Sequence, residues 1–314
     1  MKKLLILQLH DGMKNSDLRL ISFFCCFVFA STLFGQNSVR HSYSLMGKTY
    51  AYYVMQPVDS IKGILILFPG KGENPKNIFR KTRIPEVLKD KGYLTIVPEL
   101  YYSLFVDQLI KKQLKEILRI QTANPKLISP NLTLGGYSAG GSIAVSFAEY
   151  LLSFDSAFFL KSVFVIDPPL DLERFYSTAQ KFRQYNCGNL IYREGSETLN
   201  FLENSLGSPT TSFKNYFLFS PFLASQPDGG NARLLKSIPI RLYVEPDIDF
   251  VKEKYCKDLK LEDLNVTDLE KLNQVLLNSG NKNAEYIVTK GRGYHSWNIV
   301  EPGELAEWIL KFGN

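Results

Sequence analysis

Short apolar runs bounded by glycine, proline or charged residues recur along the chain. Several are apolar at successive positions, which is the pattern of strands buried on both faces of a sheet. These runs cover residues 63–70, 92–100, 132–136, 162–169, 238–247 and 284–291. Before them, residues 41–57 alternate between apolar and polar positions around a Gly-Lys pair, which predicts a two-stranded hairpin.

Helical periodicity fills several of the gaps between these runs. Residues 103–121 place apolar side chains on one helical stripe, residues 142–154 directly follow a glycine pair, and residues 265–280 end in Ser-Gly, a helix stop signal. Strands that alternate with helices of this length require a mostly parallel sheet with helices on both faces. We therefore predict an α/β fold.

The amino-acid composition restricts the size of the core and the kinds of partner that the chain can have. The chain has 314 residues, of which 45% are hydrophobic and 22% are charged, enough to bury a sizeable core. The net charge of +6 is mild and scattered, which argues against a nucleic-acid partner. Since no repeat, low-complexity block or flexible linker follows residue 36, we predict one domain over residues 36–314.

The N-terminus has the pattern of an export signal. Residues 20–34 are apolar, Lys14 and Arg19 precede them, and the run is short for a membrane span. We predict a signal peptide over residues 1–35, with Met13 as a possible true start, and a periplasmic or secreted protein. The alternative is an uncleaved anchor, the one case in which we expect membrane attachment.

Two cysteines, Cys187 and Cys256, remain after residue 35. In an exported protein they could form one disulfide, or both could stay unpaired in the core. The sequence leaves both alternatives open, and it leaves the oligomeric state open as well.

The stretch "GYSAG", residues 136–140, carries the most specific chemical signal. It fits G-x-S-x-G, in which a strand turns sharply into a helix and exposes the serine at the turn. The pentapeptide is short, but here it follows the apolar run "LTL" and precedes a predicted helix, as that turn requires. We predict Ser138 as a nucleophile.

A serine hydroxyl needs a base to take its proton. The chain has three histidines, and His10 and His41 lie near the N-terminus. His295 lies on a glycine-containing loop after the last predicted strand, where catalytic groups are common. We predict His295 as the base, against the alternative of a polar surface residue.

The third member should be a carboxylate that orients the histidine, placed between serine and histidine along the chain. We favour Asp247, the last residue of the run at 238–247, which lies in the turn just past the strand that this run predicts. Glu245 and Asp249 on the same turn are alternatives. Asp167, which ends the preceding predicted strand, is a further candidate. Its alternative role is to form a turn together with Pro168.

A tetrahedral intermediate needs two amide donors. Ala139 supplies one because it follows the nucleophile. We predict the amide of Lys71 as the second, with Gly70 as the alternative, since glycines let the loop after residue 68 bend close. The Lys71 side chain could bind an anionic substrate group or could be solvated.

Four motifs together resemble the α/β-hydrolases over nearly all of residues 36–314. They are "FPGKG" at the oxyanion loop, "GYSAGG" at the nucleophile elbow, "EPDID" at the acid turn and "GYHSW" at the histidine loop. More loosely, the chain is similar to secreted bacterial esterases of the feruloyl-esterase and polyhydroxybutyrate-depolymerase kind. It differs from them at Pro69, where many of them carry a histidine.

This resemblance implies a lid or cap inserted at about residues 168–237, after the strand that ends at Asp167. The segment is rich in aromatic residues, which could line a substrate pocket or form the small core of the lid itself. These residues are Phe175, Tyr176, Tyr185, Tyr192, Tyr216, Phe217, Phe219 and Phe222.

These observations together predict a serine hydrolase that cleaves carboxylic esters through an acyl-enzyme. We expect no metal and no organic cofactor, because the sequence has neither a Cys/His cluster nor a phosphate loop. The expected partner is a small-molecule or polymer ester. Three alternatives remain: a peptidase, an acyltransferase, and a binding protein that keeps the fold without turnover.

Overall fold

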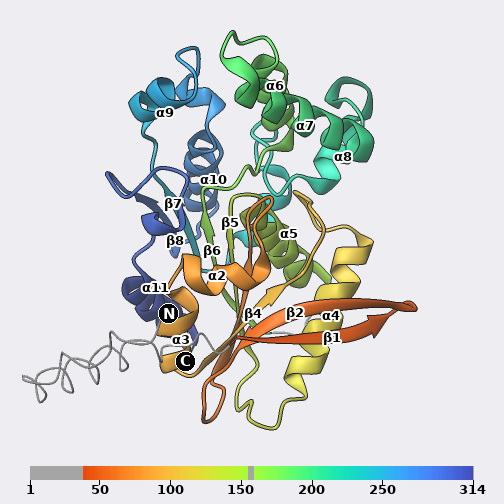
Figure 1. The fold of residues 1–314 in the computed structure, drawn as a ribbon, viewed down its shortest axis with the longest axis vertical. Coiled ribbons are helices and arrows are strands. Elements are labelled where there is room, and N and C mark those ends of the chain that lie inside the picture. Colours follow the sequence, from red (N-terminus) through yellow and green to blue (C-terminus); the bar gives the residue numbers. More distant parts are fainter. Residues whose placement is uncertain (1–37, 155–158, 314) are drawn as a thin grey trace, which may run out of the picture. The chain divides into compact units, whose positions relative to one another are not determined.

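The apolar runs form one eight-stranded sheet in the order β1-β2-β4-β3-β5-β6-β7-β8 (Figure 1). The computed structural model describes residues 38–154 and 159–313, so the predicted signal peptide lies outside the described residues. The strands are β1 Val39–Leu45, β2 Lys48–Met55, β3 Gly63–Phe68, β4 Tyr93–Pro98, β5 Asn131–Tyr137, β6 Phe159–Ile166, β7 Ile240–Val244 and β8 Ala284–Val288.

The pairing of the strands confirms a mostly parallel sheet. The hairpin β1-β2 is antiparallel and β2 pairs antiparallel with β4, whereas every pair from β4 to β8 is parallel. Every residue of β3, β4 and β7 is buried, as the continuous apolar runs predict. The carboxyl ends of β5 to β8 therefore meet at one edge of the sheet.

Helices cover both faces, because successive side chains of a strand point to opposite sides. Ile64 and Ile66 of β3 pack with α4 (Gln108–Thr122), α5 (Ala139–Phe154) and α10 (Val266–Asn278). Leu65 and Leu67 pack on the opposite face. Their partners are α2 (Pro75–Lys81), α3 (Ile84–Asp90) and α11 (Pro302–Gly313).

The helix predicted from residue 103 begins only at Gln108. Asp107 caps it, with its carboxylate accepting hydrogen bonds from the amides of Leu109 and Ile110 at 2.9 Å each. Such a cap satisfies amides that have no partner inside the helix, so the chain turns there. Leu104 and Phe105, before the cap, are buried in a different cluster of side chains.

Residues 168–237, between β6 and β7, form a helical insertion, and Figure 1 shows its helices α6, α7 and α8 grouped together in green to turquoise. They are α6 Leu172–Phe182, α7 Gly188–Leu206 and α8 Pro209–Phe219, followed by the short helix η1 Gly230–Leu235. Tyr176 and Tyr216 pack with leucines of α7 and with Leu104 in a core of their own. These two aromatic side chains are therefore core residues of the insertion.

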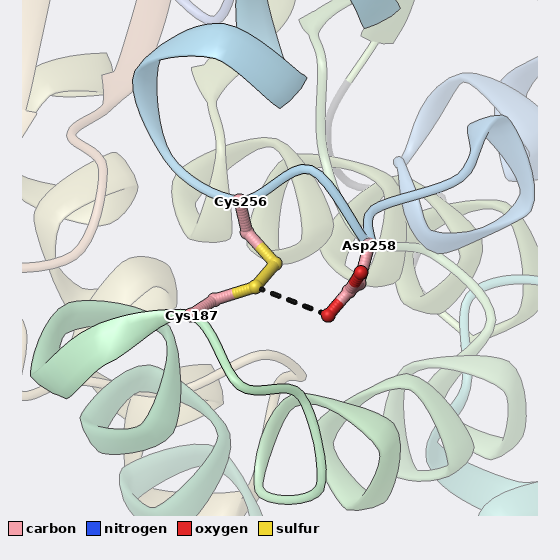
Figure 2. A group of neighbouring side chains, drawn as sticks. All are labelled: Cys187, Cys256 and Asp258. Atoms are coloured by element: carbon pink, nitrogen blue, oxygen red, sulfur yellow. Dashed lines mark hydrogen bonds between the residues drawn. A yellow bond between two sulfur atoms is a disulfide. The ribbon is translucent and has the colours of Figure 1, made fainter.

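A disulfide joins Cys187 to Cys256, which settles the pairing that the sequence left open (Figure 2). Cys187 precedes α7 of the insertion, and Cys256 follows α9 (Ile248–Lys254), which comes after β7. Asp258 Oδ2 lies 3.7 Å from Cys187 Sγ. The bond ties the insertion to the segment after β7, and cross-links of this kind stabilise mainly by restricting the unfolded chain.

Within residues 38–154 and 159–313, none of the helices combines the length and the apolar character that crossing a membrane requires.

Candidate active site

Ser138 lies at the sharp turn from β5 into α5, as predicted. Its φ is +52°, a conformation that costs energy for a residue with a side chain, and its amide donates to the carbonyl of Ile166 at 2.8 Å. A Cβ on Gly136 would lie 2.3 Å from the carbonyl oxygen of Gly140, and one on Gly140 would lie 2.3 Å from that of Phe68. Both glycines are therefore required by the close approach of the backbone.

His295 lies on the loop after β8 and lines the same pocket as Ser138. Its Nδ1 is 2.6 Å from Oδ2 of Asp167. Its carbonyl accepts a hydrogen bond from the hydroxyl of Tyr137, the residue before the serine, at 2.6 Å. The predicted nucleophile and base thus belong to one pocket, and the base has a carboxylate partner.

The carboxylate partner of the histidine is not Asp247, so the prediction for that position is wrong. Asp247 is exposed and caps α9, where its Oδ1 accepts the amide of Phe250 at 3.0 Å. Asp249, also exposed, lies in the first turn of that helix. The carboxylate that contacts the histidine follows β6 instead of β7, because Asp167 turns its side chain toward the histidine loop.

Backbone and side-chain contacts hold Asp167 in this orientation. Its φ is +48°, its amide donates to the carbonyl of Tyr243 at 2.9 Å, and its carbonyl accepts from Asn265 Nδ2 at 3.0 Å. Arg174 reaches the same asparagine at 3.2 Å and forms a two-bond ion pair with Asp268 at 2.6 and 2.7 Å. A partly buried network thus fixes the turn that carries Asp167.

The electrostatics of the pair favour the protonated imidazole. Burial acts to lower the pKa of His295, but the hydrogen bond and the negative charge of Asp167 outweigh it and raise the pKa above the ordinary value of 6.5. Glu194 and Glu73 add smaller effects in the same direction. A hydrogen bond from Nδ1–H to Asp167 leaves Nε2 as the acceptor for a proton from a nucleophile.

Glu245, an alternative for the acid, holds the histidine loop by its backbone. It follows β7 directly, is 4% exposed, and its carboxylate accepts hydrogen bonds from the amides of Arg292, Gly293 and Tyr294 at 2.8 to 3.0 Å and from the hydroxyl of Thr289 at 2.9 Å. Burial would raise the pKa of Glu245, but the hydrogen bonds that these amides donate to the carboxylate lower it below the ordinary value. The charge therefore fixes the backbone that carries the histidine.

Replacing Glu245 with glutamine should lower kcat/KM for an aryl ester by about 10²-fold, mainly through kcat, because a misplaced base loses the geometry needed for proton transfer. The amide group of glutamine offers one acceptor atom in place of two, and its NH2 would face backbone N–H groups. Steady-state kinetics on the purified variant measure the effect. Glu253→Gln, the same change at an exposed site on α9, is the control; equal kinetics for both variants would contradict this role.

The predicted oxyanion donors, Lys71 and Ala139, both line the pocket that contains Ser138. Ala139 is the first residue of α5, where an amide has no carbonyl partner inside the helix. The alternative donor, Gly70, already gives its amide to Oε2 of Glu73 at 2.8 Å. Lys71 therefore remains the better candidate for the second donor.

Glu73 connects the predicted oxyanion loop to the histidine loop. Besides the amide of Gly70, its carboxylate accepts from Lys81 Nζ at 2.6 Å and from the indole nitrogen of Trp297 at 3.1 Å. Trp297 follows His295 by two residues. One carboxylate thus holds both loops that line the pocket.

Backbone strain is concentrated at this site. Among the described residues, five non-glycine residues have positive φ, and one of them, Met46, is in the turn of the hairpin β1-β2. The other four are Ser138, Asp167, Tyr294 and His295. Strained residues persist where the surrounding structure enforces them, and they cluster at functional sites.

The pocket has a volume of about 380 Å³. Its walls come from the elbow, the loop after β3, the loop after β4, and helices α6 and α7 of the insertion. Of the aromatic residues singled out in the insertion, Phe175 lines the pocket, whereas Phe222 is buried in the main core. A second pocket of about 550 Å³ shares Lys71, Glu73, Tyr102 and Ala139 with it.

Several residues of this site are absent from the sequence-based set. Glu73, Tyr137, Arg174 and Asn265 act through contacts between distant segments, Glu194 reaches the pocket from α7, and no local motif marks any of them. Tyr137 occupies a variable position of the G-x-S-x-G pattern. For the other four, the sequence offers no signal that we recognise.

No protein-family model and no curated protein matches this sequence. Solved structures do match in fold. A carboxyl esterase from Tuber melanosporum has a TM-score of 0.58 at 16% identity, with 90% of this chain and 88% of that chain covered. An S-formylglutathione hydrolase from Agrobacterium tumefaciens has a TM-score of 0.54 at 10% identity, with coverage of 89% and 97%.

MPT51 from Mycobacterium tuberculosis matches with a TM-score of 0.58 at 13% identity, over 87% of this chain and 99% of that chain. Identities this low carry information on the fold alone. The sheet order, the elbow after β5 and these matches agree, and the chain has the α/β-hydrolase fold, with structural similarity to esterases.

Proposed function

We propose that this chain is a serine hydrolase that cleaves carboxylic esters through an acyl-enzyme. One observation carries the proposal. The imidazole of His295, 2.6 Å from Asp167, lines the same pocket as Ser138 on its strained turn. A nucleophile on an elbow, a base and an orienting carboxylate are the parts that acyl transfer requires.

In the first half of the reaction, Ser138 Oγ attacks the ester carbonyl while Nε2 of His295 takes its proton. Asp167 holds the imidazole through Nδ1 and stabilises the positive charge that forms on the ring. The negative charge on the carbonyl oxygen is received by the amides of Ala139 and Lys71. The C–O bond to the alcohol then breaks, and His295 returns its proton to the leaving oxygen.

In the second half, water attacks the acyl-enzyme. His295 takes a proton from this water, the same two amides receive the second oxyanion, and the carboxylic acid leaves as Ser138 regains its proton. An alcohol in place of water would give acyl transfer, and an amide substrate would give peptidase activity. Both alternatives use the same residues, so product analysis separates them from ester hydrolysis.

We expect the purified chain, residues 36–314, to react with a fluorophosphonate at Ser138 and to hydrolyse p-nitrophenyl acetate. A serine activated by a neighbouring base attacks phosphorus at a rate that an ordinary serine does not approach. Fragment spectra of the labelled peptide distinguish Ser138 from Ser142, and heat-denatured protein is the control. If the native protein were neither labelled nor active on the ester, the result would indicate that the chain is a binding protein that keeps this fold without turnover.

A further inference from the structure

The pocket around Ser138 contains charged side chains beyond the proposed triad, and most of them are paired. Lys81 lies 2.6 Å from Glu73, which is 9% exposed in its side chain. Lys71 lies 2.7 Å from Glu197. Both cations that line the pocket are thus neutralised by carboxylates, which argues against the anionic substrate group considered for Lys71.

Glu194 is the exception. It lines the same pocket as Ser138 and His295, and among the described residues its carboxylate has no hydrogen-bond or ion-pair partner. It projects from α7 of the helical insertion, one turn before Thr198, which also lines the pocket. The insertion therefore contributes a carboxylate to the lining of the pocket that contains Ser138.

Glu194 is exposed as a residue, so its carboxylate is accessible to a substrate that enters the pocket. Enclosure by the pocket raises its pKa, while the positive charges of His295 and Lys71 act in the opposite direction and do not cancel the effect. A carboxylate that is partly removed from water is stabilised by a cation or a strong donor placed beside it. A purely apolar acyl chain would displace water from this carboxylate without offering a hydrogen bond or a positive charge in its place.

We propose that Glu194 binds a positively charged nitrogen on the substrate, so that the preferred substrates are esters that carry an ammonium group. This inference rests on the proposed ester hydrolysis at Ser138. It assigns a recognition role to the insertion, because α7 supplies the carboxylate while the sheet edge supplies Ser138, Asp167 and His295.

Two pairs of esters with equal shape and different charge test this inference. Acetylcholine and 3,3-dimethylbutyl acetate differ in charge on the alcohol side. Ethyl 4-(trimethylammonio)butanoate and ethyl 5,5-dimethylhexanoate differ in charge on the acyl side. For at least one pair, the wild-type protein should show a kcat/KM about 10-fold higher for the cation, since attraction between the carboxylate and the quaternary nitrogen at a site of reduced dielectric is worth about that much discrimination.

The variant Glu194→Gln should remove this preference, with the loss appearing mainly as a higher KM for the cationic ester. Glu203→Gln is the matched control. Glu203 is exposed on the same helix, accepts the hydroxyl of Tyr176 at 2.8 Å, and keeps an acceptor oxygen when changed to glutamine. The control should retain the preference of the wild-type protein. Equal kcat/KM values within both pairs for the wild type would overturn the inference while leaving ester hydrolysis in place.

A binding measurement makes the test independent of turnover. By titration calorimetry, choline should bind the wild-type protein at least 10-fold more tightly than 3,3-dimethylbutan-1-ol, and Glu194→Gln should abolish the difference. Choline binding no tighter than that of the neutral alcohol, together with no preference in the acyl-side pair, would overturn the inference. Failure of the fluorophosphonate labelling would count against the proposed function and not against this cation site.

Discussion

Ser138→Ala should lower kcat for p-nitrophenyl acetate by about 10⁶-fold, the size of effect seen when the nucleophile of a serine protease triad is removed. The reason is chemical. Without the hydroxyl no acyl-enzyme forms, and the base and the oxyanion donors retain only a weak effect on direct attack by water. Alanine adopts the φ of +52° at this position about as readily as serine, so the elbow should persist.

Stopped-flow and long-time assays measure the residual rate, and the thermal melting temperature shows that the fold is intact. Ser177→Ala is the matched control. Ser177 is exposed on α6, and its hydroxyl donates to the carbonyl of Glu173 within that helix. Turnover by Ser138→Ala that equals turnover by Ser177→Ala would remove Ser138 from the mechanism.

The place of Ser138 on a sharp strand-to-helix turn could be predicted from the sequence because that geometry is locally encoded. A strand, a tight turn and a helix follow one another within a few residues, and the turn excludes a Cβ at Gly136 and Gly140. The sequence records these local steric demands directly as glycines. The same holds for the parallel sheet, because burial on both faces of β3 and β4 appears as continuous apolar runs.

The carboxylate partner of His295 could not be predicted in this way, because it depends on how neighbouring loops turn. The strands β6 and β7 end side by side, and each is followed by a carboxylate. At the end of β7, Glu245 binds the backbone of the histidine loop, while at the end of β6 the positive φ of Asp167 directs its carboxylate to the imidazole. Both turns lie between Ser138 and His295 along the chain, and both follow a strand directly. Only the tertiary contacts therefore determine which carboxylate meets the imidazole.

The residues that line the pocket also could not be predicted from the sequence. Aromatic side chains of the insertion were expected either to line a pocket or to form its core, and packing assigns Tyr176 and Tyr216 to the core and Phe175 to the pocket. Glu194 and Glu197 lie three residues apart on α7, yet Glu197 pairs with Lys71 whereas Glu194 faces the pocket with His295. Helical periodicity alone does not distinguish these roles, since both positions lie near one face.

Asp167→Asn should lower kcat for an ester substrate by about 10⁴-fold, as the corresponding change does in a serine protease triad. Asparagine has nearly the same size and tolerates a positive φ, so the turn at +48° should be preserved. Its NH2 group would favour the wrong tautomer of His295, with the proton on the nitrogen that should accept one. The charge that stabilises the imidazolium would also be lost.

A pH profile gives this variant a signature that a structural defect would lack. The base must be neutral to act, so the rise of kcat/KM with pH should have its midpoint above 6.5 in the wild-type protein, because Asp167 raises the pKa of His295. Removing that charge should move the midpoint to lower pH in Asp167→Asn, with Glu73, Glu194 and burial left as the remaining influences.

The decisive comparison is with Asp247→Asn, the same substitution at the acid that the sequence favoured. Asparagine is as good a helix cap as aspartate, so α9 should keep its first turn and kcat should stay within about 2-fold of wild type. If Asp247→Asn lost activity by orders of magnitude and Asp167→Asn did not, the acid would belong to β7 and the contact at 2.6 Å would be structural. With the reverse result, the carboxylate that orients the base is the one that follows β6.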